Sequence, residues 1–361
     1  MSVYNFCAGP AMLPAAVMEK AQKEFINWQN LGCSIMEVSH RSPAFLSVAE
    51  RAEENLRKLM GISDEYAVLF MHGGGRGQFS AVPLNLTSAS DQIGNYIVSG
   101  TWSKTAEIEA QKFCQTHACN VIQRVDGKLS TTPVSQWDLN NNAKFIHYCT
   151  NETVDGIEIN EVPSFNDQLI VADMSSNILS KEIDVNQFDV IYAGAQKNIG
   201  PSGLSIVVIR KSIIGNKQTA IPCIQDYQLA YENNSMFNTP PTFSWYLAGV
   251  VFEWLLEQGG VSEVEQVNAE KARLLYDYID NSKLYRNAIS EQNRSIMNVP
   301  FQLADESLNQ QFLAESEQQG LLALEGHRSV GGMRASIYNA MPLEGVKALV
   351  KFMHEFEGKV L

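Results

Sequence analysis

Apolar residues return along the chain in blocks whose spacing predicts secondary structure. Over residues 42–60 they recur every three or four positions, which is the repeat of one helix face. Ser42 is a favourable N-cap, Pro43 suits a first helical turn, and Gly61 suits the position after the last turn. The pattern therefore predicts an amphipathic helix over residues 42–60.

Short continuous apolar runs follow, and helical patterns lie between several of them. The runs of strand length cover residues 67–71, 95–98, 145–148, 169–172, 190–193 and 205–209. Alternation of strands with helices is typical of α/β proteins with a mostly parallel sheet. We therefore expect a layered α/β fold over this part of the chain.

The pattern changes near residue 242. Two long helical patterns are separated by Gly259 and Gly260, and Ser262 with Glu265 suggests a capping box for the second. The expected elements are helices over 243–257 and 262–280, a strand over 295–303, and helices over 308–318 and 343–356. A chain of 361 residues suits two domains. We expect a large domain over residues 16–255, and a smaller α/β domain built from residues 256–361 and the N-terminal arm, residues 1–15.

Charge and composition narrow the classes of function. A net charge of −13 disfavours nucleic acids and anionic membranes as partners. The chain has no apolar run of about 18 residues and no secretory pattern at its N-terminus, so we expect a cytoplasmic protein. The six scattered cysteines are expected to be reduced. Cys114, His117 and Cys119 lie close together, but without a second cluster they predict no metal site.

Residues suited to chemistry directly follow several of the predicted strands. A glycine-rich turn, residues 73–77, follows the first run, and Asp173 and Lys197 follow two later runs. Ligands of open α/β sheets bind beyond the carboxyl ends of the strands. We therefore expect these groups to converge at one rim of the sheet.

The glycine-rich turn is a candidate phosphate site. Backbone N–H groups at a helix start bind phosphate, and glycine allows close approach. No Gly-Lys-Ser/Thr sequence follows, and no acidic residue stands where a dinucleotide site would require it. A tight turn without a ligand is the alternative.

Asp173 and Lys197 suit a pyridoxal-phosphate site, in which a carboxylate keeps the pyridine nitrogen protonated and a lysine amine attacks the cofactor carbonyl. Lys197 lies in the small, nearly uncharged segment GAQKNIGPSG, where desolvation lowers an amine pKa. Trp102 follows the strand at 95–98 and could stack on a flat ring. The alternatives are a helix cap or metal ligand for Asp173, a solvated loop lysine, and a core tryptophan.

At these residues the sequence closely resembles the phosphoserine aminotransferases, which are fold-type I pyridoxal-phosphate enzymes of the class-V aminotransferase family. The resemblance runs essentially from end to end. It is carried by the segments NFCAGPAMLP, MEVSHRS, HGGGRGQF, HYCTNETVDGI, YAGAQKNIGPSGL, SMFNTPPTF, NRSIMNVPF and GHRSVGGMRASIYNAMPLEGV. It implies a mixed, mostly parallel sheet in a large domain, with a smaller α/β C-terminal domain.

The resemblance also implies roles for individual residues. Lys197 is the expected Schiff-base lysine, Asp173 the partner of the pyridine nitrogen and Trp102 the stacking aromatic. The further expected cofactor contacts are Gly75, Arg76, Thr153 and Gln196. Asn238 and Thr239 are expected to reach the cofactor phosphate of the other subunit, which implies a homodimer with shared active sites.

On the substrate side, the resemblance implies that Arg334 holds the α-carboxylate. The candidates for the substrate phosphate or the distal carboxylate are His40, Arg41, Arg76, His327 and Arg328. A solvated surface position is the alternative for any single arginine. Ala8 departs from some relatives, which carry serine there, so we expect no side-chain contact with the amino donor at this position.

The implied reaction transfers an amino group reversibly from L-glutamate to 3-phosphohydroxypyruvate, giving O-phospho-L-serine and 2-oxoglutarate in serine biosynthesis. A second expected product is 4-phosphohydroxy-L-threonine, in pyridoxine biosynthesis. The rival interpretations are a desulfurase or an alanine–glyoxylate type transaminase on the same fold, a nicotinamide dehydrogenase, and a non-catalytic binding protein.

Overall fold

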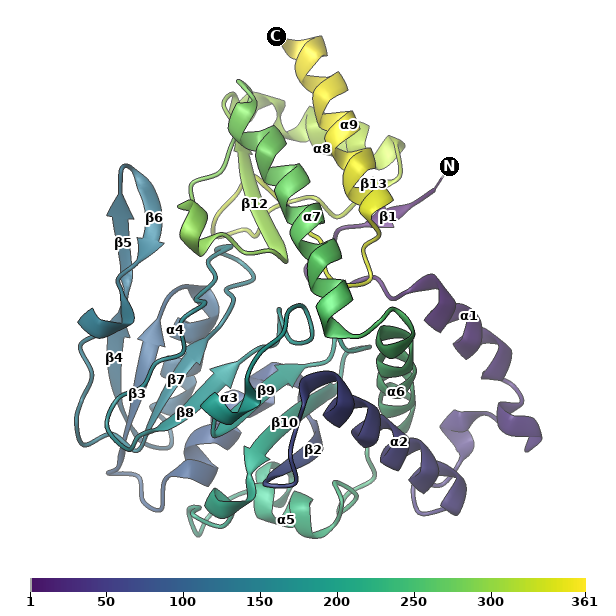
Figure 1. Ribbon diagram of the computed structural model, residues 1–361, viewed down its shortest axis with the longest axis vertical. Helices are drawn as coiled ribbons and strands as arrows, with labels where there is room; N and C mark the ends of the chain where they lie inside the picture. Colours follow the sequence, from purple (N-terminus) through teal and green to yellow (C-terminus); the bar gives the residue numbers. More distant parts are fainter. Residues whose placement is uncertain (1) are drawn as a thin grey trace.

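A seven-stranded mixed sheet forms the centre of the larger part of the structure (Figure 1). The computed structural model describes residues 2–361. The strand order is β2-β10-β9-β8-β7-β3-β4, and only β10 runs antiparallel to its two neighbours. The strands are β2 (Tyr66–His72), β3 (Ile93–Val98), β4 (Gln115–Asn120), β7 (Phe145–Cys149), β8 (Leu169–Asp173), β9 (Val190–Gly194) and β10 (Leu204–Arg210). The predicted α/β fold with a mostly parallel sheet is confirmed.

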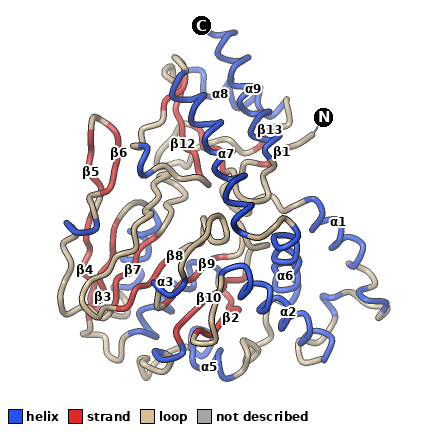
Figure 2. Tube along the Cα trace, in the orientation of Figure 1, coloured by secondary structure: helices blue, strands red, loops and turns tan. Residues whose placement is uncertain are grey.

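Helices cover both faces of this sheet, and both layers can be followed in Figure 2. Val68 and Phe70 of β2 pack into a cluster with α2 (Pro43–Met60) and α6 (Thr242–Glu257). The alternate side chains, Ala67, Leu69 and Met71, pack with the helices on the opposite face. These are α3 (Gly74–Leu86), α4 (Thr101–Ala110) and α5 (Tyr227–Glu232). Both faces of the strands are therefore buried, which explains their continuous apolar runs.

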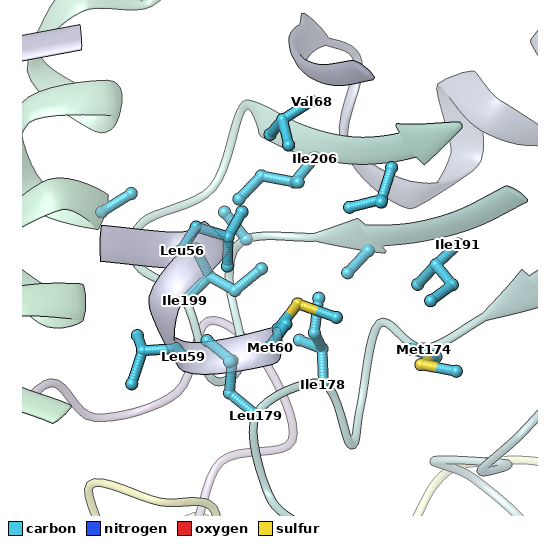
Figure 3. Close-up of a cluster of buried hydrophobic side chains, with 14 of the residues drawn as sticks. Leu56, Leu59, Met60, Val68, Met174, Ile178, Leu179, Ile191, Ile199 and Ile206 are labelled. Carbon is cyan, nitrogen blue, oxygen red and sulfur yellow. The ribbon is translucent and has the colours of Figure 1, made fainter. Parts of the chain in front are cut away.

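Helix α2 begins and ends as its sequence predicts. The Ser42 hydroxyl accepts the N–H of Phe45 at 3.3 Å, Pro43 occupies the first turn, and Gly61 has a left-handed φ of 66°. Leu56, Leu59 and Met60 point from α2 toward Ile206 of β10 and the loop side chains drawn in Figure 3. This packing fixes one face of the sheet beneath the loops that follow β8 and β9.

A second hydrophobic cluster lies in the smaller part of the structure, which is shown in light green and yellow in Figure 1. It combines Phe6 of the N-terminal arm with side chains between residues 272 and 356. Its elements are α7 (Val261–Asn281), α8 (Asn309–Gln318), α9 (Leu343–Val360), β1 (Tyr4–Asn5), β11 (Tyr285–Arg286), β12 (Asn298–Leu303), β13 (Leu321–Leu322) and β14 (Met333–Ser336). The division at residues 16–255 stays a prediction.

The structure differs from the sequence pattern in several local details. Ser262 lies inside α7, because Gly260 with a φ of 84° is the N-cap, so the predicted capping box is wrong. Glu265 instead accepts the backbone N–H of Glu182 at 2.9 Å. Helix α9 extends to Val360, four residues beyond the expected end at 356. The pattern missed α1 (Ala15–Glu24), β4, β14 and the hairpin of β5 (Ile122–Val125) with β6 (Lys128–Thr131). Within residues 2–361, none of the helices has the length and apolar character that a membrane crossing requires.

Three asparagine amides join the two parts of the structure. Asn198, Asn339 and Asn268 donate to the consecutive carbonyls of Ile178, Leu179 and Ser180, at 2.8–3.0 Å. Asn198 directly follows Lys197, whereas the other two asparagines belong to the smaller part. Buried amides of this kind hold a loop in one conformation because leaving any one unpaired costs free energy.

Lys271 of α7 is a fully buried lysine that organises the chain after β14. Its ammonium group donates to the carbonyls of Ile337, Tyr338 and Met341 at 2.8–3.0 Å. Burial lowers the pKa of Lys271 to about 7. The three N–H donors match three carbonyl acceptors, so this side chain fixes the segment that follows Arg334 on β14.

Replacing Lys271 by methionine tests whether its three hydrogen bonds stabilise the fold. We expect Lys271→Met to lower the free energy of unfolding by about 3 kcal/mol, because three buried carbonyls lose their donor. That corresponds to a melting temperature lower by about 5 °C. Lys347→Met, at an exposed position of α9, is the matched control. Equal melting temperatures for the two variants would contradict the assignment.

Candidate active site

A cavity of about 450 Å³ lies where the loops after β2, β7, β8 and β9 meet. This volume lies in the range of small-molecule sites. The cavity is lined by Pro10, Gly73, Gly74, Gly75, Arg76, Phe79, Trp102, Cys149, Asn151, Thr153, Asp173, Ser175, Ser176, Gln196, Lys197, Ser202 and Gly203. Parallel strands end at the same edge, so residues that are distant in sequence converge there.

Lys197 follows β9 and is 8% exposed. Its Nζ donates to the Thr153 hydroxyl at 2.5 Å. Burial lowers the pKa of Lys197 to about 8, and the negative charge of Asp173 opposes this change. The side chain therefore reaches its neutral, nucleophilic form at a much lower pH than a solvated lysine.

Asp173 ends β8 and is buried beside Lys197. Its Oδ1 accepts the backbone N–H of Ser175 at 2.8 Å, and the thiol of Cys149 lies 3.9 Å from Oδ2. Burial raises the pKa of Asp173, while the contacts from Ser175 and the positive charge of Lys197 oppose the rise. A buried carboxylate with this environment favours a cationic donor as its partner.

The N-terminus of α3 faces the same cavity through the glycine-rich turn. Gly73 is the N-cap with a φ of 91°, and α3 begins at Gly74. A Cβ at Gly75 would lie 3.0 Å from the Ser175 hydroxyl, so a side chain there would crowd the loop after β8. The first N–H groups of a helix have no partner within the helix, and they carry its positive dipole end. The turn is therefore built to receive an anion.

Trp102 lies near the start of α4 and forms one wall of the cavity. The centre of its ring is 5.1 Å from the Arg76 guanidinium carbon and 5.9 Å from Lys197 Nζ. Within the described residues its buried Nε1 has no hydrogen-bond partner. A flat aromatic face beside two cations suits a planar, anionic ligand.

Arg334 reaches the edge of the site from β14. Its Nη1 lies 3.5 Å from the carbonyl of Thr153, and its buried Nε has no partner among residues 2–361. An arginine with free buried donors is suited to bind a carboxylate. Tyr338, four residues later, donates to the carbonyl of Ala8 at 2.8 Å, so Ala8 contributes a backbone contact here.

The other predicted site residues do not line this cavity within one chain. His327 and Arg328 are exposed on the loop before β14, and His327 Nδ1 lies 2.7 Å from the Ser329 hydroxyl. The remaining residues outside the cavity lining are His40, Arg41, Asn238, Thr239 and Arg334, of which Arg334 contacts the lining residue Thr153. His72, at the end of β2, contacts the carbonyl of Thr239 at 2.9 Å, which fixes that loop beside the glycine-rich turn.

Sequence reasoning missed several residues of the lining, including Ser175 and Ser176. Ser175 and Ser176 lie two and three residues after Asp173, so their position after a strand end was a usable signal. The Ser175 hydroxyl also accepts the N–H of Gly194 at 3.0 Å, which ties the loop after β8 to the end of β9.

Comparison with known proteins decides the family. The chain matches the model of class-V aminotransferases over residues 3–349. This chain belongs to the class-V aminotransferase family. It is also 62% identical over 356 residues to the phosphoserine aminotransferase of Pseudoalteromonas translucida (strain TAC 125), with 99% of each chain covered.

Solved structures of the family agree. The phosphoserine aminotransferase of Bacillus circulans subsp. alkalophilus has a TM-score of 0.94 at 41% identity, with 99% of each chain covered. The phosphoserine aminotransferase of Trichomonas vaginalis, solved with pyridoxal phosphate bound, has a TM-score of 0.92 at 37% identity and covers 98% of this chain and 100% of that one. The predicted family and the fold-type I architecture are confirmed.

Class-V aminotransferases use pyridoxal 5′-phosphate, and the residues around the cavity fit it. Lys197 offers a buried amine, Asp173 a buried carboxylate, and α3 an N-terminus where a Cβ at Gly75 would intrude. The face of Trp102 borders the space between them. The protein is thus a pyridoxal-phosphate-dependent aminotransferase.

The lowered pKa of Lys197 predicts how the apoenzyme captures its cofactor as pH changes. The neutral amine is the nucleophile, so the rate of covalent attachment should rise with pH and level off above about pH 8. At pH 7 about a tenth of the amine is neutral, against well under a thousandth for a lysine of ordinary pKa. Stopped-flow absorbance of apoenzyme mixed with pyridoxal phosphate measures this rate.

The control for this pH dependence is Nα-acetyl-lysine under the same conditions, whose rate should keep rising toward pH 10. A protein rate that follows the free lysine across the whole range would show that the site does not lower the pKa of Lys197.

Proposed function

We propose that the chain is a phosphoserine aminotransferase that moves an amino group from L-glutamate to 3-phosphohydroxypyruvate, giving O-phospho-L-serine and 2-oxoglutarate. The 62% identical relative carries this name. The observation that favours phosphorylated substrates is local: in a protein of net charge −13, Arg76 lines the cavity and Arg334 contacts the carbonyl of Thr153 at its edge. Cations at the site oppose the negative charge of the rest of the chain and favour multiply anionic ligands there.

When bound, pyridoxal phosphate supplies the carbonyl that accepts the amino group and a ring that takes up electrons from the substrate Cα. Lys197 holds the cofactor and then moves the proton at Cα, acting as nucleophile and as general acid and base. Asp173 keeps the pyridine nitrogen protonated. Trp102 packs over the ring, and the N–H groups of Gly75 and Arg76 bind the phosphate.

The remaining contacts divide between cofactor and substrate. Thr153, already hydrogen-bonded to Lys197 Nζ, and Gln196 border the cofactor. Arg334 binds the α-carboxylate through the donors that lack partners in the chain. The Arg76 guanidinium, exposed beside Trp102, is placed to bind the substrate phosphate or distal carboxylate. His327 and Arg328, on the loop before β14, also bind the substrate phosphate or distal carboxylate.

The chain acts as a homodimer with shared active sites. Large apolar side chains are exposed on two stretches of the chain. The first stretch includes Ile26, which is 80% exposed, and the second includes Phe237, which is 46% exposed. The stretches approach one another where the rings of Phe25 and Phe243 lie 5.9 Å apart. Exposed apolar surface of this kind favours a protein interface.

Near the same stretches lie predicted site residues that do not line the cavity of their own chain. His40 and Arg41 follow the first stretch, and Asn238 and Thr239 directly follow Phe237. Across the proposed interface, Asn238 and Thr239 reach the cofactor phosphate of the partner, and His40 and Arg41 bind substrate anions. By family resemblance, the enzyme also forms 4-phosphohydroxy-L-threonine for pyridoxine synthesis, and it works in the cytoplasm.

Steady-state kinetics with matched oxo acids test the substrate class. With L-glutamate as donor, kcat/KM for 3-phosphohydroxypyruvate should exceed that for 3-hydroxypyruvate at least about a hundredfold, because the site's cations are left unpaired by the second. Lys197→Ala should abolish turnover with both. Equal values for the two acceptors, or a preference for glyoxylate, would favour a transaminase of a different specificity on this fold.

Complementation tests the shared site. Lys197→Ala and the double variant Asn238→Ala/Thr239→Ala should each have little activity alone. After mixing and re-association, half of the dimers are mixed and hold one intact site, so about a quarter of the wild-type activity should return. No recovery, with mixed dimers demonstrated by tagged purification, would place Asn238 and Thr239 in the site of their own chain.

A further inference from the structure

A short segment after β7, residues 151–155, contacts several of the elements that form the cavity. Asn151 donates to the Ser176 hydroxyl at 2.8 Å, and Thr153 contacts both Lys197 and Arg334. Between these two lies Glu152, which is 0% exposed and which the mechanism above does not use. A buried carboxylate is costly unless it is well hydrogen-bonded, so its presence needs an explanation.

Both carboxylate oxygens of Glu152 accept hydrogen bonds from the helix that carries Trp102. Oε2 accepts the backbone N–H of Trp102 and Oε1 that of Ser103, each at 2.8 Å. These N–H groups belong to the first turn of α4, where the helix has no partner for them and its dipole is positive. The carboxylate therefore fixes the backbone nitrogen of Trp102, which is bonded to the Cα that carries the side chain.

A glycine at position 100 allows Glu152 to lie against the start of α4. A Cβ at Gly100 would lie 2.7 Å from the carboxyl carbon of Glu152 and 2.6 Å from Asp155 Oδ2, so only glycine fits without a shift. The turn is also closed from the other side, because the Ser103 hydroxyl accepts the N–H groups of Ser99 and Gly100. Those bonds hold the turn before α4, whereas the N–H groups of Trp102 and Ser103 are accepted by Glu152.

We propose that Glu152 is a positioning residue, which holds the Trp102 ring against the cofactor and links that position, through the adjacent Thr153, to Lys197 and Arg334. This inference rests on the proposed role of Trp102 as the stacking aromatic. Burial raises the pKa of Glu152 to about 7, with the charge of Asp155 adding to the rise, whereas the N–H groups of Ser103 and Trp102 lower it. The bonds that place the tryptophan therefore favour the carboxylate form, and burial opposes them.

The chain offers a matched control. Asp155 Oδ2 accepts the N–H of Thr101 at 2.8 Å, so it caps the same helix end without touching Trp102. A general loss of helix capping would affect Glu152→Gln and Asp155→Asn alike. A positioning role predicts a larger effect for Glu152→Gln on properties that report the ring.

The experiment is a double-mutant cycle on the holoenzyme with Glu152→Gln, Trp102→Leu and the combined variant. The readouts are the Kd for pyridoxal phosphate, the visible circular dichroism of the bound cofactor, kcat, and KM for L-glutamate. We expect Glu152→Gln to raise Kd and lower kcat by about tenfold each, with KM changed less than about twofold. Asp155→Asn should change Kd by less than about threefold.

Non-additivity is the decisive result. In the Trp102→Leu background, Glu152→Gln should change Kd by no more than about twofold, because the group it positions is gone. The proposal would be overturned if the changes in Kd caused by the two single substitutions simply multiplied in the combined variant. Unchanged cofactor dichroism in the Glu152→Gln single variant would overturn it as well. If Trp102→Leu leaves Kd and dichroism unchanged, this inference falls, whereas loss of transamination with intact cofactor binding would instead count against the proposed function.

A second variant covers the case in which Glu152→Gln does not fold. Gly100→Ala keeps every charged group and, at a φ of 174°, adds no backbone strain, but its Cβ displaces the Glu152 carboxylate from α4. We expect it to alter the cofactor dichroism and raise Kd in the same direction as Glu152→Gln. A Gly100→Ala enzyme with wild-type dichroism and Kd would contradict the proposal by itself.

Discussion

The burial of one lysine amine beside one carboxylate is the constraint on which the site depends. Lys197 and Asp173 are both nearly enclosed, and burial opposes the charged form of each. Attraction between the two charges opposes the effect of burial only in part, so the pKa of Lys197 stays lowered and that of Asp173 stays raised. The result is an amine that loses its proton near neutral pH, which is what attack on a carbonyl requires.

The fold supplies this arrangement through parallel strands. Asp173 and Lys197 lie beyond adjacent strands β8 and β9, and the glycine-rich turn lies beyond β2. The three asparagine amides and Lys271 then fix the loops against the smaller part of the structure, which brings Arg334 to the edge of the same cavity. Groups that lie more than a hundred residues apart thus meet in one site, because hydrogen bonds tie together the loops that carry them.

Much of this was visible in the sequence, because local signals and strand ends carry it. The apolar runs located six strands of the large sheet, and the residues that follow them include Gly75, Asp173 and Lys197. What the sequence could not show depends on distant contacts. The Ser262 cap failed because Gly260, at a positive φ, is the N-cap two residues earlier, and α7 begins at Val261. The contact of Glu152 with α4 joins segments about 50 residues apart and leaves no periodic trace.

The most direct test of the account is to find which lysine carries the cofactor. The holoenzyme would be reduced with borohydride, before and after addition of L-glutamate, and its peptides examined by mass spectrometry. The account predicts cofactor on Lys197 alone, and its loss when glutamate is added before reduction. Label on Lys271, the other buried lysine whose pKa is lowered, or on no lysine at all, would contradict it.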